Sequence, residues 1–76
     1  MSIQVMMFGK LADITGSSVS VSNITDTDTL INTLQNMYPL LAETKYIIAV
    51  NREVIKGNTI LDNNSVVALL PPFSGG

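Results

Sequence analysis

The 76-residue sequence contains neither cysteine nor histidine. The chain therefore forms no disulfide, no thiolate or imidazole metal site, and no nucleophile–base pair built on either residue. The six aspartates and glutamates show no metal-loop spacing. We accordingly predict no metal site and no cofactor bound by this chain.

Charged side chains are also scarce. They make up 13% of the residues, with four cations against six anions and a net charge of −2. The cations Lys10, Lys45, Arg52 and Lys56 are scattered, whereas nucleic-acid-binding domains carry a clustered basic face, so we predict no nucleic-acid partner. Hydrophobic residues make up 46%, which excludes a disordered chain. A small domain with so little charge is expected to have part of its surface covered by a partner.

Long hydrophobic runs are missing as well. The longest apolar run has five residues, against the roughly 20 that cross a membrane. The first residues lack the positive and apolar segments of a signal peptide. We expect no membrane association and a cytoplasmic location.

Short apolar runs and alternating patterns predict five strands. They cover residues 3–8, 19–21, 46–50, 54–55 and 66–70. Residues 10–14 predict one helical turn closed by Gly16. Ile60 and Leu61 stand alone in a polar stretch and are expected to anchor it to the core.

One amphipathic helix is expected in the middle of the chain. Apolar residues at positions 30, 31, 34, 37 and 38 fall on one helical stripe. Thr27 is the expected N-cap, with Asp26 as the close alternative. Pro39 ends the helix near Tyr38.

This order of elements predicts an α+β fold in one domain, residues 1–76, with one main helix on one face of a mixed sheet. A single helix covers one face only, yet several strands are apolar on both faces. Either loops cover the second face or it is an exposed docking surface, and the low charge favours docking. The expected docking residues are Met6, Phe8 and Leu69.

The last six residues, Pro71-Pro72-Phe73-Ser74-Gly75-Gly76, show no helix or strand pattern. We expect a flexible tail over residues 71–76, with a reach of about 20 Å when extended. The prolines direct its base away from the sheet, and Phe73 is expected to anchor it in a partner. The two glycines permit entry into a narrow channel.

The carboxylate of Gly76 is the only functional group at the end of this tail. A carboxylate becomes electrophilic after conversion to a better leaving group such as an acyl-adenylate, and an amine or sulfur nucleophile then takes the acyl group. The chain would thus be a substrate or carrier for enzymes that bring their own catalytic residues. The alternative is that the glycines merely end a frayed terminus.

The whole chain resembles the small subunit of molybdopterin synthase, a MoaD-like, ubiquitin-like sulfur carrier. The resemblance begins with the segment from Val5 to Gly16 and continues through Ala49-Val50-Asn51. It is most specific in the closing block, Leu69-Leu70-Pro71-Pro72-Phe73-Ser74-Gly75-Gly76. Three features depart from the family. Leu69-Leu70 stands where aromatics are frequent, Phe73 where valine is frequent, and Asn63-Asn64-Ser65 where Gly-Asp-Glu or a similar run is frequent.

The resemblance implies a β-grasp fold and a defined chemistry. A ubiquitin-activating-type adenylyltransferase would use ATP to adenylate Gly76, which would then become a thiocarboxylate. The tail would insert into the large synthase subunit, within a heterotetramer. Sulfur would pass to cyclic pyranopterin monophosphate and form the molybdopterin dithiolene.

Three other functions stay open. One is a sulfur carrier for thiamine or another thiocarboxylate pathway, against which the Pro71-Pro72 pair argues. Another is a ubiquitin-like modifier joined to target lysines through Gly76. The last is a plain interaction domain with an idle tail.

Overall fold

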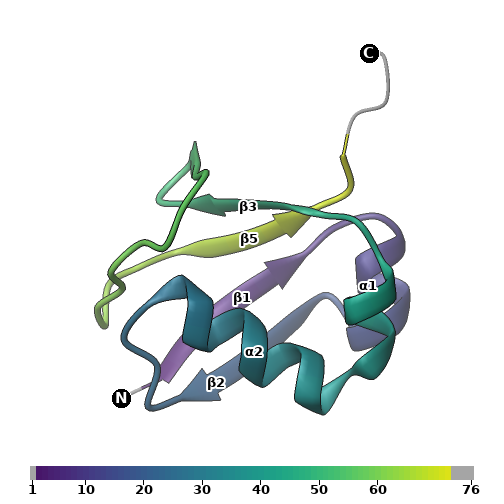
Figure 1. Cartoon of the computed structure of the whole chain (residues 1–76), viewed down its shortest axis with the longest axis horizontal. Coiled ribbons are helices and arrows are strands. Elements are labelled where there is room, and N and C mark those ends of the chain that lie inside the picture. The colour runs from purple at the N-terminus through teal and green to yellow at the C-terminus, as the bar shows by residue number, and fades with distance from the viewer. Residues whose placement is uncertain (1, 73–76) are drawn as a thin grey trace.

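Five strands pair into one mixed sheet in the computed structural model, which describes residues 2–72 (Figure 1). The elements are β1 (Ser2–Met7), α1 (Lys10–Thr15), β2 (Ser18–Ser22), α2 (Thr27–Met37), the 3-10 helix η1 (Pro39–Glu43), β3 (Ile47–Val50), β4 (Glu53–Val54) and β5 (Val67–Leu70). The strand order is β2-β1-β5-β3-β4. β1 and β5 are parallel, and the other neighbours are antiparallel. The α+β class with a mixed sheet is confirmed.

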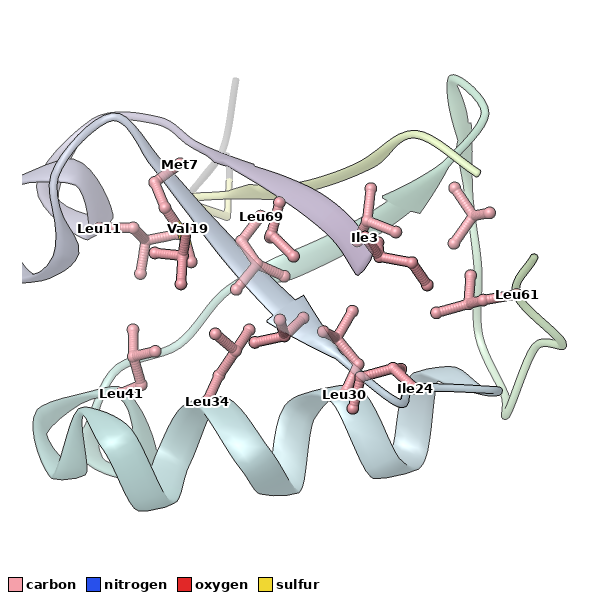
Figure 2. Packing of buried hydrophobic residues seen from close by; sticks show 14 residues of the cluster. Ile3, Met7, Leu11, Val19, Ile24, Leu30, Leu34, Leu41, Leu61 and Leu69 are labelled. Carbon is pink, nitrogen blue, oxygen red and sulfur yellow. The ribbon is translucent and has the colours of Figure 1, made fainter. Parts of the chain in front are cut away.

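The core lies between the sheet and α2. Strand β1 alternates strictly, with Ile3, Val5 and Met7 buried and the residues between them exposed. Leu30 and Leu34 point from α2 towards this inner face of the sheet (Figure 2). The period of two in the strand and the first part of the helical stripe in α2 thus bury the side chains that the sequence pattern predicts. Met37, on the same predicted stripe, is instead 49% exposed at the end of the helix.

Asp26, the alternative predicted cap, is the N-cap of α2. Its side chain accepts a hydrogen bond from the Thr29 N–H at 3.0 Å. Thr27 is instead the first helical residue and is buried, with its hydroxyl accepting from the Thr59 N–H at 2.9 Å. The preference for Thr27 is therefore wrong, because its hydroxyl is engaged by a distant loop. The helix ends at Met37 with Tyr38 as C-cap, as Pro39 predicts.

The chain also differs from the sequence-based expectation at residue 60 and in the segment after α2. Leu61 is buried, but Ile60 is 78% exposed and anchors nothing. Residue 60 forms an isolated antiparallel bridge with Asp26, and in extended backbone its side chain points opposite to that of Leu61. The helix η1, which the sequence pattern does not predict, buries Leu41.

The hairpin between β3 and β4 is tighter than predicted. Asn51 and Arg52 both have positive φ, 52° and 71°, and Val50 pairs with Glu53 across them. A two-residue turn of this kind matches the twist of an antiparallel hairpin. The short strand consequently begins at Glu53, one residue earlier than the sequence pattern indicates.

Candidate functional site

The chain leaves the sheet at the end of β5, where the predicted tail begins (Figure 1). Pro71 is half-buried and Pro72 is exposed. Neither residue has an N–H to continue the ladder, which explains why the strand stops at Leu70. The proline pair therefore ends the sheet at the position that the sequence predicts.

Strand β1 ends beside this exit. Because β1 and β5 are parallel, their carboxyl ends lie at the same end of the sheet. The Phe8 N–H donates to the Leu69 carbonyl at 3.2 Å, so the pairing continues beyond β1. The turn into α1, including Gly9, thus lies against the base of the tail, with Gly9 touching Pro71.

An apolar row crosses the outer face of the sheet, the face turned away from α2. Met6 pairs with Ala68, Ala68 with Ala49, and Ala49 with Val54, so these four residues lie side by side on four strands. Met6 is 45% and Val54 62% exposed. We call these four residues the outer row. Both of its ends are open to solvent.

The three predicted docking residues divide into two groups. Met6 and Phe8 are exposed, and their role in docking stays a prediction. Leu69 is fully buried, because it pairs with Met7 and shares the inner face with it. The prediction that Leu69 contacts a partner is wrong; Leu70, one residue further, lies on the outer face opposite Ile47.

The reactive part of the predicted tail lies outside the described residues. Phe73, Ser74, Gly75 and Gly76 are in this group, so the predicted roles of the anchor and of the terminal carboxylate stay predictions. The described structure ends at Pro72, at the base of the tail.

A polar cluster joins the N-terminus of α2 to the loop before Leu61. The Asn58 amide donates to the Asp26 carboxylate at 3.1 Å and its oxygen accepts from the Asp28 N–H at 2.9 Å. Hydrogen bonds from Thr29, and then from Asn58, lower the pKa of Asp26. These hydrogen bonds tie the first turn of the helix to the loop, which indicates a structural role. The sequence pattern does not single out Asn58, because its partners lie about thirty residues away in the chain.

Residues 2–72 contain no group of three acidic side chains placed to hold a metal ion. Within the same part of the chain, no helix has the length and apolar character needed to cross a membrane. The described residues set where the predicted tail begins.

A family model described as the ThiS family matches residues 5–76. The chain belongs to the ThiS family. The match begins within β1, takes in the other four strands and includes both prolines at the exit, so it covers most of the body together with the tail.

Solved structures place this ThiS-family chain among ubiquitin-like proteins. SAMP1 from Haloferax volcanii is 26% identical, with a TM-score of 0.76 and complete coverage of both chains. A complex of subunits 1 and 2 of the molybdopterin-converting factor from Helicobacter pylori has a chain that is 26% identical, with a TM-score of 0.65 and the same coverage. The HVO 2177 protein of Haloferax volcanii shares the fold at a TM-score of 0.79 and 21% identity, with all of this chain and 87% of that one covered.

These similarities confirm the β-grasp fold and the resemblance to MoaD-like carriers. The chain is a ThiS/MoaD-like sulfur carrier or ubiquitin-like protein.

Proposed function

We propose that this chain is the sulfur carrier subunit of molybdopterin synthase. The Gly76 carboxylate attacks ATP on a ubiquitin-activating-type adenylyltransferase, giving an acyl-adenylate and pyrophosphate. A sulfur nucleophile displaces AMP and leaves a thiocarboxylate. On the large synthase subunit, two thiocarboxylates in turn each give one sulfur to cyclic pyranopterin monophosphate and are hydrolysed back to carboxylates, and the two sulfurs form the dithiolene.

The observation that carries this proposal is the end of β5 together with the amino-acid sequence that follows it. A proline pair stops β5 at Leu70, and four residues without charged side chains follow, ending in two glycines. The family match continues through this segment to residue 76. A carrier needs such an arm, because its reactive group must enter the active site of another protein.

The outer row gives the body a surface suited to a large subunit. It is apolar and free of charged side chains, as the central parts of protein interfaces tend to be. The converting-factor structure from Helicobacter pylori contains two different subunits in one complex. We accordingly propose that the large subunit covers Met6 and Phe8, with Leu70 in place of the predicted Leu69.

Precursor conversion by a purified large subunit tests the proposal. Wild-type protein carrying a chemically prepared thiocarboxylate is expected to convert the precursor. Removing Gly76 before preparing the thiocarboxylate moves the reactive group by one residue, about 3.5 Å. Adding one glycine after Gly76 moves it by the same step. Since a misplacement of about 1 Å can cost a hundredfold in rate, both variants should be inactive while their melting temperatures stay unchanged. Near-normal conversion by either variant would refute the role of the tail.

A ubiquitin-like modifier is the second candidate, favoured by the similarity to SAMP1. Adenylation of Gly76 would be shared, and a lysine amine would then accept the acyl group. The two functions differ in the product. A modifier forms an amide with a target protein, whereas a sulfur carrier has a free carboxylate again after it has given up its sulfur. Peptide mapping of cell extract for Gly75-Gly76 joined to lysine therefore separates them.

A further inference from the structure

Gly9 lies opposite the first residue of the tail. The parallel register pairs Val5 with Val67 and Met7 with Leu69, and two further steps bring Gly9 beside Pro71. The hydrogen bond from the Phe8 N–H to the Leu69 carbonyl shows that the pairing does extend past β1. The turn after β1 and the base of the tail are thus neighbours through the sheet itself.

A side chain at position 9 would overlap the ring of Pro71. A Cβ placed on Gly9 would lie 2.7 Å from Pro71 Cγ, 3.5 Å from Cδ and 3.9 Å from Cβ. The first distance is well inside the roughly 3.5–4.0 Å at which two carbons attract. The ring therefore rests directly on the bare backbone of Gly9.

The turn that contains Gly9 is itself held in place by hydrogen bonds and by the core. Gly9 has φ 58° and ψ −134°, a conformation that glycine adopts without steric cost, and it is the N-cap of α1. Its carbonyl accepts from the Ala12 N–H at 3.1 Å, and the Phe8 carbonyl accepts from the Leu11 N–H at 3.2 Å. The Leu11 side chain is fully buried, so the turn is anchored to the core.

Holding the Pro71 ring fixes the direction in which the chain leaves the sheet. The ring locks φ of Pro71, and a residue before proline, here Leu70, is restricted to extended backbone. The five residues that follow Pro71 can span at most about 18 Å. The exit direction sets where the arm begins, and a misplacement of about 1 Å of a reacting group can cost about a hundredfold in rate.

We propose that Gly9 is a positioning residue for the tail: its bare backbone seats the Pro71 ring and aims the arm that delivers the Gly76 thiocarboxylate. This inference rests on the proposed sulfur-carrier function. It assigns to the β1–α1 turn a part in the transfer step that is separate from docking by the outer row.

Two glycines flank α1 and give a matched pair of variants. Gly9 and Gly16 both have positive φ, 58° and 92°, so alanine is strained at either position. Only at position 9 does the new Cβ meet another group, since nothing lies within 4 Å of it at position 16.

The experiment measures single-turnover sulfur transfer from each thiocarboxylated variant to precursor at saturating large subunit, together with Kd for that subunit. We expect Gly9→Ala to transfer at least about tenfold more slowly than Gly16→Ala, with the two Kd values within about twofold. Equal transfer rates would overturn the proposal.

Pro71→Ala completes a double-mutant cycle. This substitution keeps only the Cβ of residue 71, which lies 3.9 Å from a Cβ placed on Gly9, an ordinary contact. We expect Pro71→Ala alone to slow transfer without lowering the melting temperature, and Gly9→Ala to have little further effect when combined with it. Independent effects that multiply would contradict a shared role.

A measurement on the unmodified chain keeps the inference testable if Gly9→Ala fails to fold. Nuclear Overhauser contacts between the Gly9 Hα and the Pro71 ring protons are expected in the wild-type protein. Their absence would overturn the proposed packing of the Pro71 ring on Gly9. Wild-type protein that transfers no sulfur would refute the proposed function, and these contacts would then decide the inference about Gly9 by themselves.

Discussion

The two faces of the sheet differ in what their side chains do. On the inner face, Val5, Val67 and Leu69 are fully buried in the hydrophobic core. Figure 2 shows Leu69 on the side of the sheet that faces α2. On the outer face, Met6 and Val54 are about half exposed and are joined by two alanines. The inner face is apolar and is covered within the described part of the chain, whereas the outer face combines an uncovered apolar row with polar side chains such as Gln4.

This contrast separates stability from recognition along a single strand. In β1, each residue belongs to the opposite face from its neighbour, so Met7 contributes to the core and Met6 to the outer row. Substitutions one residue apart should therefore have different consequences, one in unfolding and the other in partner binding.

The largest expected effect on stability is on the inner side. Leu34→Ala should lower the free energy of unfolding by about 3 kcal/mol, because the side chain is fully buried and its removal leaves a cavity. Met37→Ala, on the same helix but 49% exposed, is the control and should cost far less. Urea unfolding of both variants checks this, and equal costs would contradict the assignment of the inner face.

Breaking the outer row should instead weaken binding. Met6→Asp places an unpaired charge in the proposed interface and should raise Kd for the large subunit about thirtyfold, or about 2 kcal/mol. Its melting temperature should change little, because Met6 is exposed. Gln4→Asp adds the same charge to the same face outside the outer row and serves as the control. Calorimetric titration that finds equal Kd values for the two variants would show that the outer row does not dock.

A smaller effect is expected where α2 meets the loop before Leu61. Asn58→Ala removes the hydrogen bonds to Asp26 and to the Asp28 N–H and should cost about 1 kcal/mol of stability. Binding to the large subunit should change little, since neither Asn58 nor Asp26 is a member of the outer row. Asn63→Ala, in an exposed turn, is the control for urea unfolding. A cost no larger than that of the control would contradict the joining role of Asn58.

The smallest expected effect is a dependence on pH. Hydrogen bonds from Thr29 and Asn58 lower the pKa of Asp26 in the folded state, so the unfolded chain binds the proton more readily. The contribution of Asp26 to stability is present above its ordinary pKa near 4 and is lost as the pH falls through the lower folded value. Asp26→Asn keeps a capping oxygen but cannot titrate, so the difference in stability between the two proteins should shrink below about pH 4. A difference independent of pH would exclude this linkage.

Much of the fold follows from local pattern. The alternation in β1 and the stripe in α2 predict both elements and their buried sides, because each pattern is decided by neighbours in the chain. The prolines at 71 and 72 predict where the sheet ends for the same reason. The sequence also indicates an apolar second face, of which Met6 and Phe8 are exposed members.

The sequence-based predictions fail where the structure depends on contacts between residues that are far apart in the chain. The prediction for Leu69 is wrong because the side of the last strand that faces the core depends on its parallel pairing with β1. The cap of α2 depends on Thr59 and Asn58, far along the chain. The local pattern indicates only that Gly9 ends a strand, and the register with β5 is what brings it onto Pro71.

The most direct test of the carrier function is the chemical state of Gly76 in protein purified from cells with the pathway active. A thiocarboxylate replaces one oxygen by sulfur and adds about 16 Da, but oxidation of one of the four methionines adds about the same mass. The chain has no cysteine, so alkylation by iodoacetamide at neutral pH should report the thiocarboxylate alone. We predict a single alkylated product with the label on the peptide that ends at Gly76. Protein from active cells that shows a free carboxylate at Gly76 and takes up no label would contradict the sulfur-carrier function.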